Sequence, residues 1–342
     1  MSKSKTKNET VKRISQLTVI NPTAAGIDVS DKEMMVAYPI GSGQLEVRSF
    51  GCFTSDLHAI AKTLRKFSIT SVAMESTGVY WIPLFLLLQE YGFEVCLVNA
   101  KHVKNVTGRK DDESDAEWIQ KLHSCGLLKA SFQPDSLTRT LRSIVRHRKS
   151  LERTCSSYIN RIQKAMELMN IKLHTIISDI DGKTGLLIIE AILAGERNPE
   201  VLADLRDRRI KATREEIIKS LEGHYTTEHL FELRQCYQLY CTHRQMIDEC
   251  DREIEKQLIG QVASKNEGVI TNIPEVKRKA LGKHKVSFNA TAYLKEIFGV
   301  DVTEVFGISE LSALAILSEV GTDMSKWKTE HHFTSWLGLA PN

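Results

Sequence analysis

Residues 24–30 read Ala-Ala-Gly-Ile-Asp-Val-Ser, an apolar run that closes on polar residues. A run this short, bounded by polar residues, predicts a buried β-strand. Two more strand patterns follow at 34–38 and 45–50, and the Gly-Ser-Gly segment 41–43 between them is typical of a hairpin turn. The folded part of the chain is therefore predicted to begin with a three-stranded meander.

After the meander, strand and helix patterns alternate. The expected helices are 54–67, 80–91 and 112–125, and the expected strands are 71–74 and 94–98. The order βββαβαβα predicts an α/β domain with a mixed sheet covered by helices, as in the ribonuclease H-like (RuvC-like) fold. Half of an actin-like ATPase has the same order, but its glycine-rich phosphate loop has no counterpart, because segment 41–43 is too short.

The rest of the chain reads as helical. Long helices are predicted over 136–173 and 226–258, with short helices over 178–222 between them, which indicates a helical hairpin or coiled coil that could form a dimer surface. A small helical segment follows, with an apolar helix over 311–320. The predicted organisation is a basic disordered arm (1–20), a RuvC-like domain (21–130), a helical coiled-coil domain (131–264) and an incomplete C-terminal domain (265–342).

The composition narrows the class of protein. Hydrophobic residues make up 42% of the chain and charged residues 26%, which excludes a wholly disordered chain. None of the seven cysteines forms a C-x-x-C pair, so reduced thiols and a cytoplasmic location are expected. No apolar run is long enough for a signal peptide or a transmembrane helix.

The charge is unevenly distributed, although the net value is only +3. Residues 16–128 carry 10 basic and 13 acidic side chains, whereas residues 129–174 carry 10 basic and 3 acidic ones. The net charge is weak evidence for nucleic-acid binding, but a mildly acidic domain followed by a strongly basic segment is a pattern that the function should explain.

Four acidic side chains are candidates for that site. Asp28 and Glu75 end the first and fourth predicted strands, which are neighbours in a ribonuclease H-like sheet. Asp112 and Asp115 open the predicted helix 112–125 with i, i+3 spacing, although Asp111 shares that face equally well and acids also favour a helix N-terminus. Converging carboxylates select Mg²⁺ or Mn²⁺, and two such ions could promote phosphodiester cleavage.

Basic side chains lie on both sides of these acids in the sequence. Lys101, Lys104, Arg109 and Lys110 precede the acidic helix and could grip phosphates beside the metal. The basic helix carries a further set, for which we expect salt-dependent binding of nucleic acid: Arg139, Arg142, Arg146, Arg148, Lys149 and Arg153.

Together these motifs resemble the DEDD-type insertion-sequence transposases, whose best-known members are RNA-guided bridge recombinases. The resemblance rests on segments 26–30, 75–81, 98–100 and 108–116 and on the C-terminal runs 308–324 and 332–341. It implies a RuvC-like domain, a coiled-coil middle and a C-terminal transposase domain. It also implies Asp28, Glu75, Asp112 and Asp115 as the catalytic, metal-binding tetrad, and thereby selects Asp112 over Asp111.

The resemblance further implies partners. These are DNA at the element ends and at the target, a structured guide RNA, and other copies of the chain in a dimer or tetramer that exchanges strands. In the family a serine that follows the Gly-Leu-Ala-Pro motif is the nucleophile, whereas here residues 338–341 are followed only by Asn342. We therefore assign no nucleophile and expect a chain cut short before the serine. Two alternatives remain, a metal-dependent nuclease that uses water and a truncated non-catalytic relative that binds nucleic acid.

Overall fold

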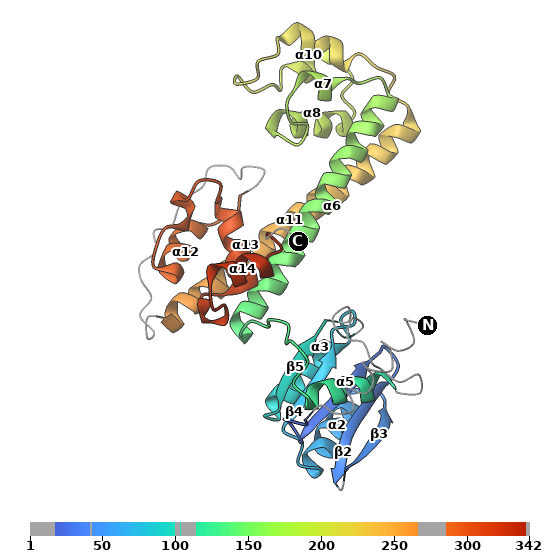
Figure 1. Ribbon diagram of the computed structural model, residues 1–342. Coiled ribbons are helices and arrows are strands. Elements are labelled where there is room, and N and C mark those ends of the chain that lie inside the picture. Colours follow the sequence, from blue (N-terminus) through green and yellow to red (C-terminus); the bar gives the residue numbers. More distant parts are fainter. Residues whose placement is uncertain (1–17, 42, 100–102, 104–113, 266–284, 340–342) are drawn as a thin grey trace, which may run out of the picture. The chain divides into compact units, whose positions relative to one another are not determined.

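The computed structural model describes residues 18–41, 43–99, 103, 114–265 and 285–339. The chain divides into two compact units, residues 1–133 and 134–342. The first holds the sheet and the second is helical (Figure 1).

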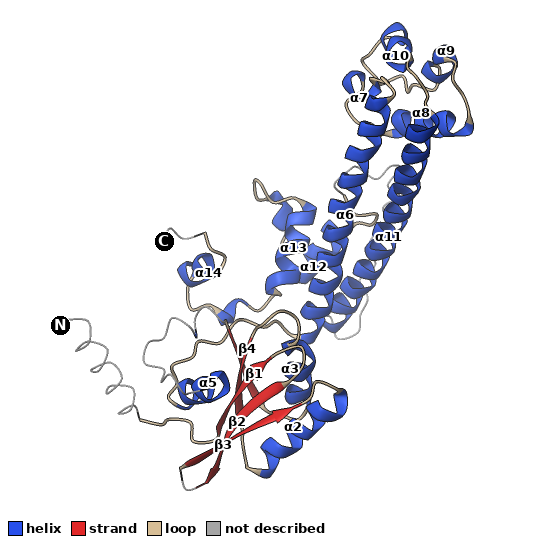
Figure 2. Cartoon of the chain, turned by 90° about the vertical axis from the view of Figure 1, so that its right-hand side faces the viewer, coloured by secondary structure: helices blue, strands red, loops and turns tan. Residues whose placement is uncertain are grey.

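The first unit is built on a five-stranded mixed sheet (Figure 2). Its strands are β1 (Ala24–Val29), β2 (Met34–Gly41), β3 (Gln44–Phe50), β4 (Ser71–Glu75) and β5 (Glu94–Val98). The spatial order is β3-β2-β1-β4-β5, with β1, β2 and β3 antiparallel and with β4 parallel to both β1 and β5. This is the ribonuclease H-like arrangement, and it confirms the predicted fold class.

Helices cover both faces of this sheet. On one face, α2 (Thr54–Lys66) and α3 (Trp81–Glu90) bury apolar side chains against alternate residues of β1, among them Ile27 and Val29. On the other face, α5 (Asp115–Ser124) packs Trp118, Ile119 and Leu122 against β4 and β5. Because strand residues alternate between faces, Gly26 and Asp28 of β1 lie on the α5 side.

The second unit is dominated by two long helices, α6 (Ser136–Leu168) and α11 (Thr227–Lys265), which pack antiparallel along their length. Asp135 caps α6 by accepting the Thr138 N–H at 2.9 Å. The helix ends at Leu168, earlier than predicted, and Asn170 then takes a left-handed φ of 57°. The short helices α7 (Leu173–Ile176), α8 (Lys183–Ala194), α9 (Pro199–Ala203) and α10 (Arg214–Leu221) bury their apolar faces at one end of this hairpin (Figure 1).

The C-terminal segment forms short helices, and the first and third of them pack on the opposite end of the hairpin. The helices of this segment are α12 (Ala290–Phe298), η1 (Val302–Glu304), α13 (Glu310–Val320), η2 (Met324–Lys326) and α14 (Glu330–Trp336). Leu294 of α12 and Leu317 of α13 share one buried cluster with Leu141 of α6 and Leu258 of α11. Residues 134–342 thus cluster as one unit, and a separate domain over 265–342 stays a prediction.

None of the helices in the described part of the chain combines the length and the apolar composition needed to cross a membrane.

Candidate functional site

The first two candidate acids are placed side by side by the sheet register. The parallel strands β1 and β4 pair Gly26 with Ala73 and Ile27 with Met74, so the next position brings Asp28 beside Glu75. Adjacent strands lie about 4.8 Å apart, and paired residues of parallel strands face the same side of a sheet. Both carboxylates therefore project from the carboxyl ends of neighbouring strands, on the face that α5 covers.

Helix α5 brings a third acid to the same edge. It runs antiparallel to β1, because Ser124 O accepts the Ile20 N–H at 2.9 Å while Gln120 Nε2, nearer the start of α5, donates to Ala24 O at 3.1 Å. Further along β1, a Cβ on Gly26 would lie 2.5 Å from Ala116 O. The start of α5, and with it the exposed Asp115, thus lies toward the end of β1 that carries Asp28.

The start of α5 corrects one step of the sequence argument. The helix begins at Asp115 and not at Asp112, because Ser114 adopts an extended conformation and caps it. The Glu117 carboxylate accepts two hydrogen bonds from Ser114, one from its backbone N–H at 2.8 Å and one from its side-chain hydroxyl at 2.7 Å. These bonds are part of a capping box. The i, i+3 helical spacing therefore does not relate Asp112 to Asp115. Asp112 and the bases Lys101, Lys104, Arg109 and Lys110 lie outside the described residues.

The chemistry of these donors fits a hard divalent cation. Carboxylate oxygens are the preferred ligands of Mg²⁺, which usually keeps several waters and takes only one or two carboxylates. No three of the described His, Cys, Asp and Glu side chains are grouped closely enough to form a metal site by themselves. Asp28 and Glu75 would therefore hold the ion together with water, and Asp112 and Asp115 are the further ligands of the predicted tetrad.

Thr77, which was not among the residues predicted from sequence, positions the Glu75 carboxylate. Its hydroxyl donates to Glu75 Oε1 at 3.0 Å and so restricts the carboxylate's rotation. The following turn is fixed by Gly78, whose φ is 56°, and by Trp81, whose indole N–H donates to Gly78 O at 3.2 Å. A hydroxyl two residues after a strand-end acid was the available sequence signal, because Ser and Thr commonly bond to neighbours at that distance.

Gly26 sets the distance between α5 and β1, and we expect its substitution to destabilise the protein. In a Gly26→Ala variant the new Cβ would meet two backbone atoms, Gln120 N at 2.2 Å and Ala116 O at 2.5 Å. The helix must then move off the sheet, so the free energy of unfolding should fall by about 1–3 kcal/mol. Chemical denaturation followed by circular dichroism measures this change.

Gly260 provides the matched control for that substitution. It lies inside helix α11, and a Cβ there would have no heavy atom within 4 Å. Gly260→Ala should therefore stabilise the protein by about 0.5–1 kcal/mol, because alanine favours a helix interior. Equal stability of Gly26→Ala and the wild type would show that α5 is not held at this distance.

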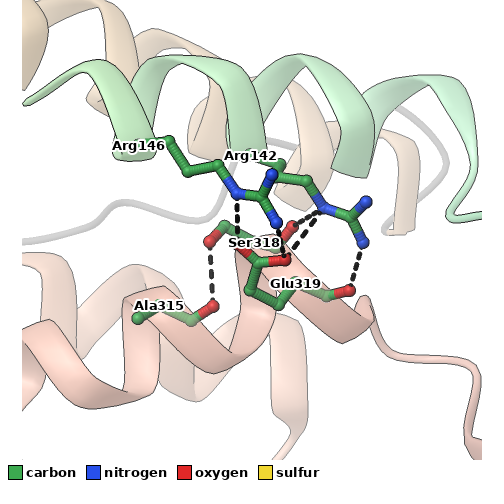
Figure 3. Close-up of polar contacts among 5 residues, drawn as sticks. All are labelled: Arg142, Arg146, Ala315, Ser318 and Glu319. Atoms are coloured by element: carbon green, nitrogen blue, oxygen red, sulfur yellow. Dashed lines mark hydrogen bonds and ion pairs between the residues drawn. The ribbon is translucent and has the colours of Figure 1, made fainter. Parts of the chain in front are cut away.

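Several basic residues of α6 form ion pairs within the second unit (Figure 3). Arg146 makes two hydrogen bonds of 2.7 Å to the Glu319 carboxylate, and these bonds raise the pKa of its guanidinium. Arg142 donates to Ser318 O at 3.3 Å and to Glu319 O at 2.5 Å, which satisfies carbonyls at the end of α13, and burial lowers its pKa. Both arginines thus hold α13 against α6.

Arg148 requires a correction, because its side chain is only 4% exposed. Its guanidinium donates to Asp251 Oδ1 at 2.5 Å, to Glu152 Oε1 at 2.6 Å and to Lys285 O at 3.2 Å. Asp251 is fully buried and also accepts the Ser287 N–H at 2.8 Å. The prediction that Arg148 contacts nucleic acid is therefore wrong. Its buried side chain, together with Asp251, links α6 to α11 and to residues 285–287 through hydrogen bonds. Arg139 is half-buried, whereas Lys149 is exposed.

Comparison with protein families decides the identity of the chain. Residues 25–171 match the family model of the DEDD-type IS110 transposases, and residues 301–342 match the model of the transposase IS116/IS110/IS902 family. The chain belongs to the IS110 family of DEDD-type transposases. The first match spans the candidate acids and most of α6, and the second covers the segment from η1 onward in this transposase.

Two solved structures of RuvC from Thermus thermophilus are similar to part of the transposase. RuvC in complex with its Holliday junction substrate is 16% identical, and the match covers 32% of this chain and 99% of RuvC with a TM-score of 0.25. A second RuvC structure is 18% identical with the same coverage and a TM-score of 0.23. No curated protein sequence matches the chain.

Proposed function

We propose that this transposase binds DNA and cleaves its strands in a reaction that requires Mg²⁺ or Mn²⁺. The observation that supports the proposal is the β1–β4 register, whose last pair, Ile27 with Met74, directly precedes Asp28 and Glu75 where two parallel strands end. The antiparallel course of α5 adds Asp115 at the same edge of the sheet. Membership of a transposase family supports DNA as the substrate.

In the proposed mechanism, the carboxylates of Asp28 and Glu75 hold the cation and fix its place at the sheet edge. Thr77 keeps the Glu75 carboxylate oriented, and the capping box of Ser114 and Glu117 keeps Asp115 at the start of α5. When bound, the metal supplies activation of the attacking oxygen and stabilisation of the leaving oxygen. The rigid strand ends restrict the motion of the acids, which favours a preorganised site.

Removal of divalent metal should abolish cleavage. Protein dialysed against EDTA should leave a duplex that carries the element ends intact, and addition of Mg²⁺ or Mn²⁺ should restore nicking, as seen on a denaturing gel. The circular dichroism spectrum should be the same before and after dialysis, because the acids end strands that are held by apolar cores. Equal cleavage with and without EDTA would contradict the proposed metal site.

The finer parts of the proposal follow from the family resemblance. They are binding of a structured guide RNA, pairing of element and target DNA, and strand exchange by a homo-oligomer. A covalent protein–DNA link that survives denaturation would support exchange. The alternative, a metal-dependent nuclease that uses water, predicts cleaved DNA without any such link.

A further inference from the structure

We propose that nucleic acid binds along the middle of the α6–α11 hairpin, and not at the arginines near the start of α6. The surface consists of Lys149, Arg153, Arg161 and Lys164 of α6 and Arg244 of α11, which we call the hairpin basic surface. Its occupant is the phosphate backbone of duplex DNA, the substrate of the proposed function. This inference rests on the proposed function and identifies where its nucleic acid is held.

The four α6 residues share the solvent-facing side of the helix. Positions 149, 153, 157, 160 and 164 repeat at intervals of three or four residues, and all five side chains are exposed. Ser157 and Asn160 fill the positions between the basic residues and can also bond to phosphate oxygens. At 1.5 Å per residue the row extends for about 22 Å, which is long enough to meet several phosphates.

The charge of this surface is not compensated, in contrast to that of the predicted arginines. Arg142 and Arg146 are paired with Glu319, and Arg148 with Asp251 and Glu152. Within the described part of the chain, no carboxylate lies within ion-pair distance of Lys149, Arg153, Arg161 or Lys164. Four positive charges on one face therefore remain for a ligand.

The facing stretch of α11 adds to this charge. The α11 stretch beside the row contains Arg244, and residues 234–246 contain no acid, whereas Asp248 and Glu249 follow before Asp251. The two helices lie side by side here, since the Tyr158 and His243 rings are 5.1 Å apart. Between Lys149 and Lys164 the one acid is Glu152, which Arg148 already engages. The positive charge of the middle of the hairpin is thus concentrated on the α6 face.

A cavity at one end of the row can receive a phosphate-sized group. It has a volume of about 220 Å³ and lies between α6 and α11. Its lining includes Lys149, Arg153 and Arg244, with the acids Glu152 and Asp181. The lining therefore has three cations against two carboxylates, of which Glu152 also lies 2.6 Å from Arg148.

The make-up of the surface favours nucleic acid over a protein partner. Between Lys149 and Lys164 every exposed residue is basic or carries a hydroxyl or an amide, whereas the apolar residues are buried or half-buried. The core of a protein interface needs apolar side chains, while a phosphate backbone needs cations and hydrogen-bond donors.

The test compares two variants that each lose four positive charges. The first replaces the α6 members of the surface by glutamine: Lys149→Gln, Arg153→Gln, Arg161→Gln and Lys164→Gln. The control replaces four exposed basic residues elsewhere in the second unit: Arg208→Gln, Lys211→Gln, Lys219→Gln and Lys256→Gln. Thermal unfolding of both should match the wild type, because none of the eight side chains is buried.

Fluorescence anisotropy against salt concentration then gives the affinity for a DNA duplex and for an RNA hairpin. We expect the surface variant to bind about 100-fold more weakly at about 0.1 M salt, with a salt slope smaller by about 3 to 4. The control should stay within about threefold of the wild type. Loss of affinity for the DNA duplex would support the inference, whereas a loss confined to the RNA hairpin would contradict it.

Equal losses in the two variants, or no loss in the surface variant for either probe, would overturn the inference. Failure of the proposed function would look different. In that case the wild type would still bind nucleic acid through the hairpin basic surface. The Asp28→Asn and Glu75→Gln variants would then cleave DNA at the wild-type rate.

Discussion

Asp28→Asn and Glu75→Gln should each reduce metal-dependent DNA cleavage by at least about 100-fold while the protein remains folded. Loss of a group that only orients a metal ligand typically costs 10- to 100-fold, so loss of a ligand itself should cost at least as much. Both substitutions preserve side-chain shape and remove only the charge. Nicking of a labelled duplex under single-turnover conditions measures the loss, and circular dichroism verifies the fold.

Two other acids of the first unit, Asp31 and Glu94, serve as matched controls for these variants. Asp31 is exposed in the turn after β1, and Glu94 begins β5 at the opposite end of the sheet from Glu75. Asp31→Asn and Glu94→Gln should both cleave at the wild-type rate. If Asp28→Asn or Glu75→Gln also cleaved at that rate, the β1–β4 edge would not be the catalytic centre.

Asp251→Asn should lower the free energy of unfolding by about 3–5 kcal/mol, the largest stability effect expected in the second unit. The substitution removes the charge of a fully buried carboxylate 2.5 Å from the Arg148 guanidinium and leaves that guanidinium with Glu152, whose side chain is 29% exposed. Loss of the buried partner of a buried charge is strongly destabilising. The substitution also weakens the contact that holds Ser287. Urea denaturation gives the change.

Two further variants test the physical cause of that loss. In the exposed pair of Arg209 and Asp207, where the arginine side chain is 86% exposed, Arg209→Gln should leave the midpoint of urea unfolding at the wild-type value, because water screens an exposed ion pair. The double variant Arg148→Met with Asp251→Leu should recover most of the loss, since it removes both buried charges. A stability of Asp251→Asn within 1 kcal/mol of the wild type would show that the pair is not required.

The fold was largely predictable because its signals are local. The apolar run 24–29 and the Gly-Ser-Gly turn at 41–43 specify strands and a hairpin through short-range conformational preferences. The alternation of strands and helices after residue 54 then leaves few arrangements of a mixed sheet. The helix boundaries were less accurate. Helix α6 ends at Leu168 and not at 173, α11 continues to Lys265 and not to 258, and α5 starts at Asp115, where a capping box that includes Ser114 decides the start.

The candidate site was predictable only in part. Asp28 and Glu75 could be paired from sequence, because strand ends and strand order follow from local patterns. Asp115 depends on the packing of α5 on Gly26, a contact between residues ninety positions apart.

The sequence by itself determined the strand order, the acids at the strand ends and the presence of a long basic helix. Only the tertiary structure decided which basic residues of that helix remain available. Periodicity shows that Arg148 and Lys149 lie on different faces, but the buried face depends on the partner helices α11 and α13. Asp251 is 103 residues from Arg148 in the chain, and Glu319 is 173 residues from Arg146. Such pairings form only when distant segments pack, so the exposed Lys149, Arg153, Arg161 and Lys164 could be distinguished only in the folded chain.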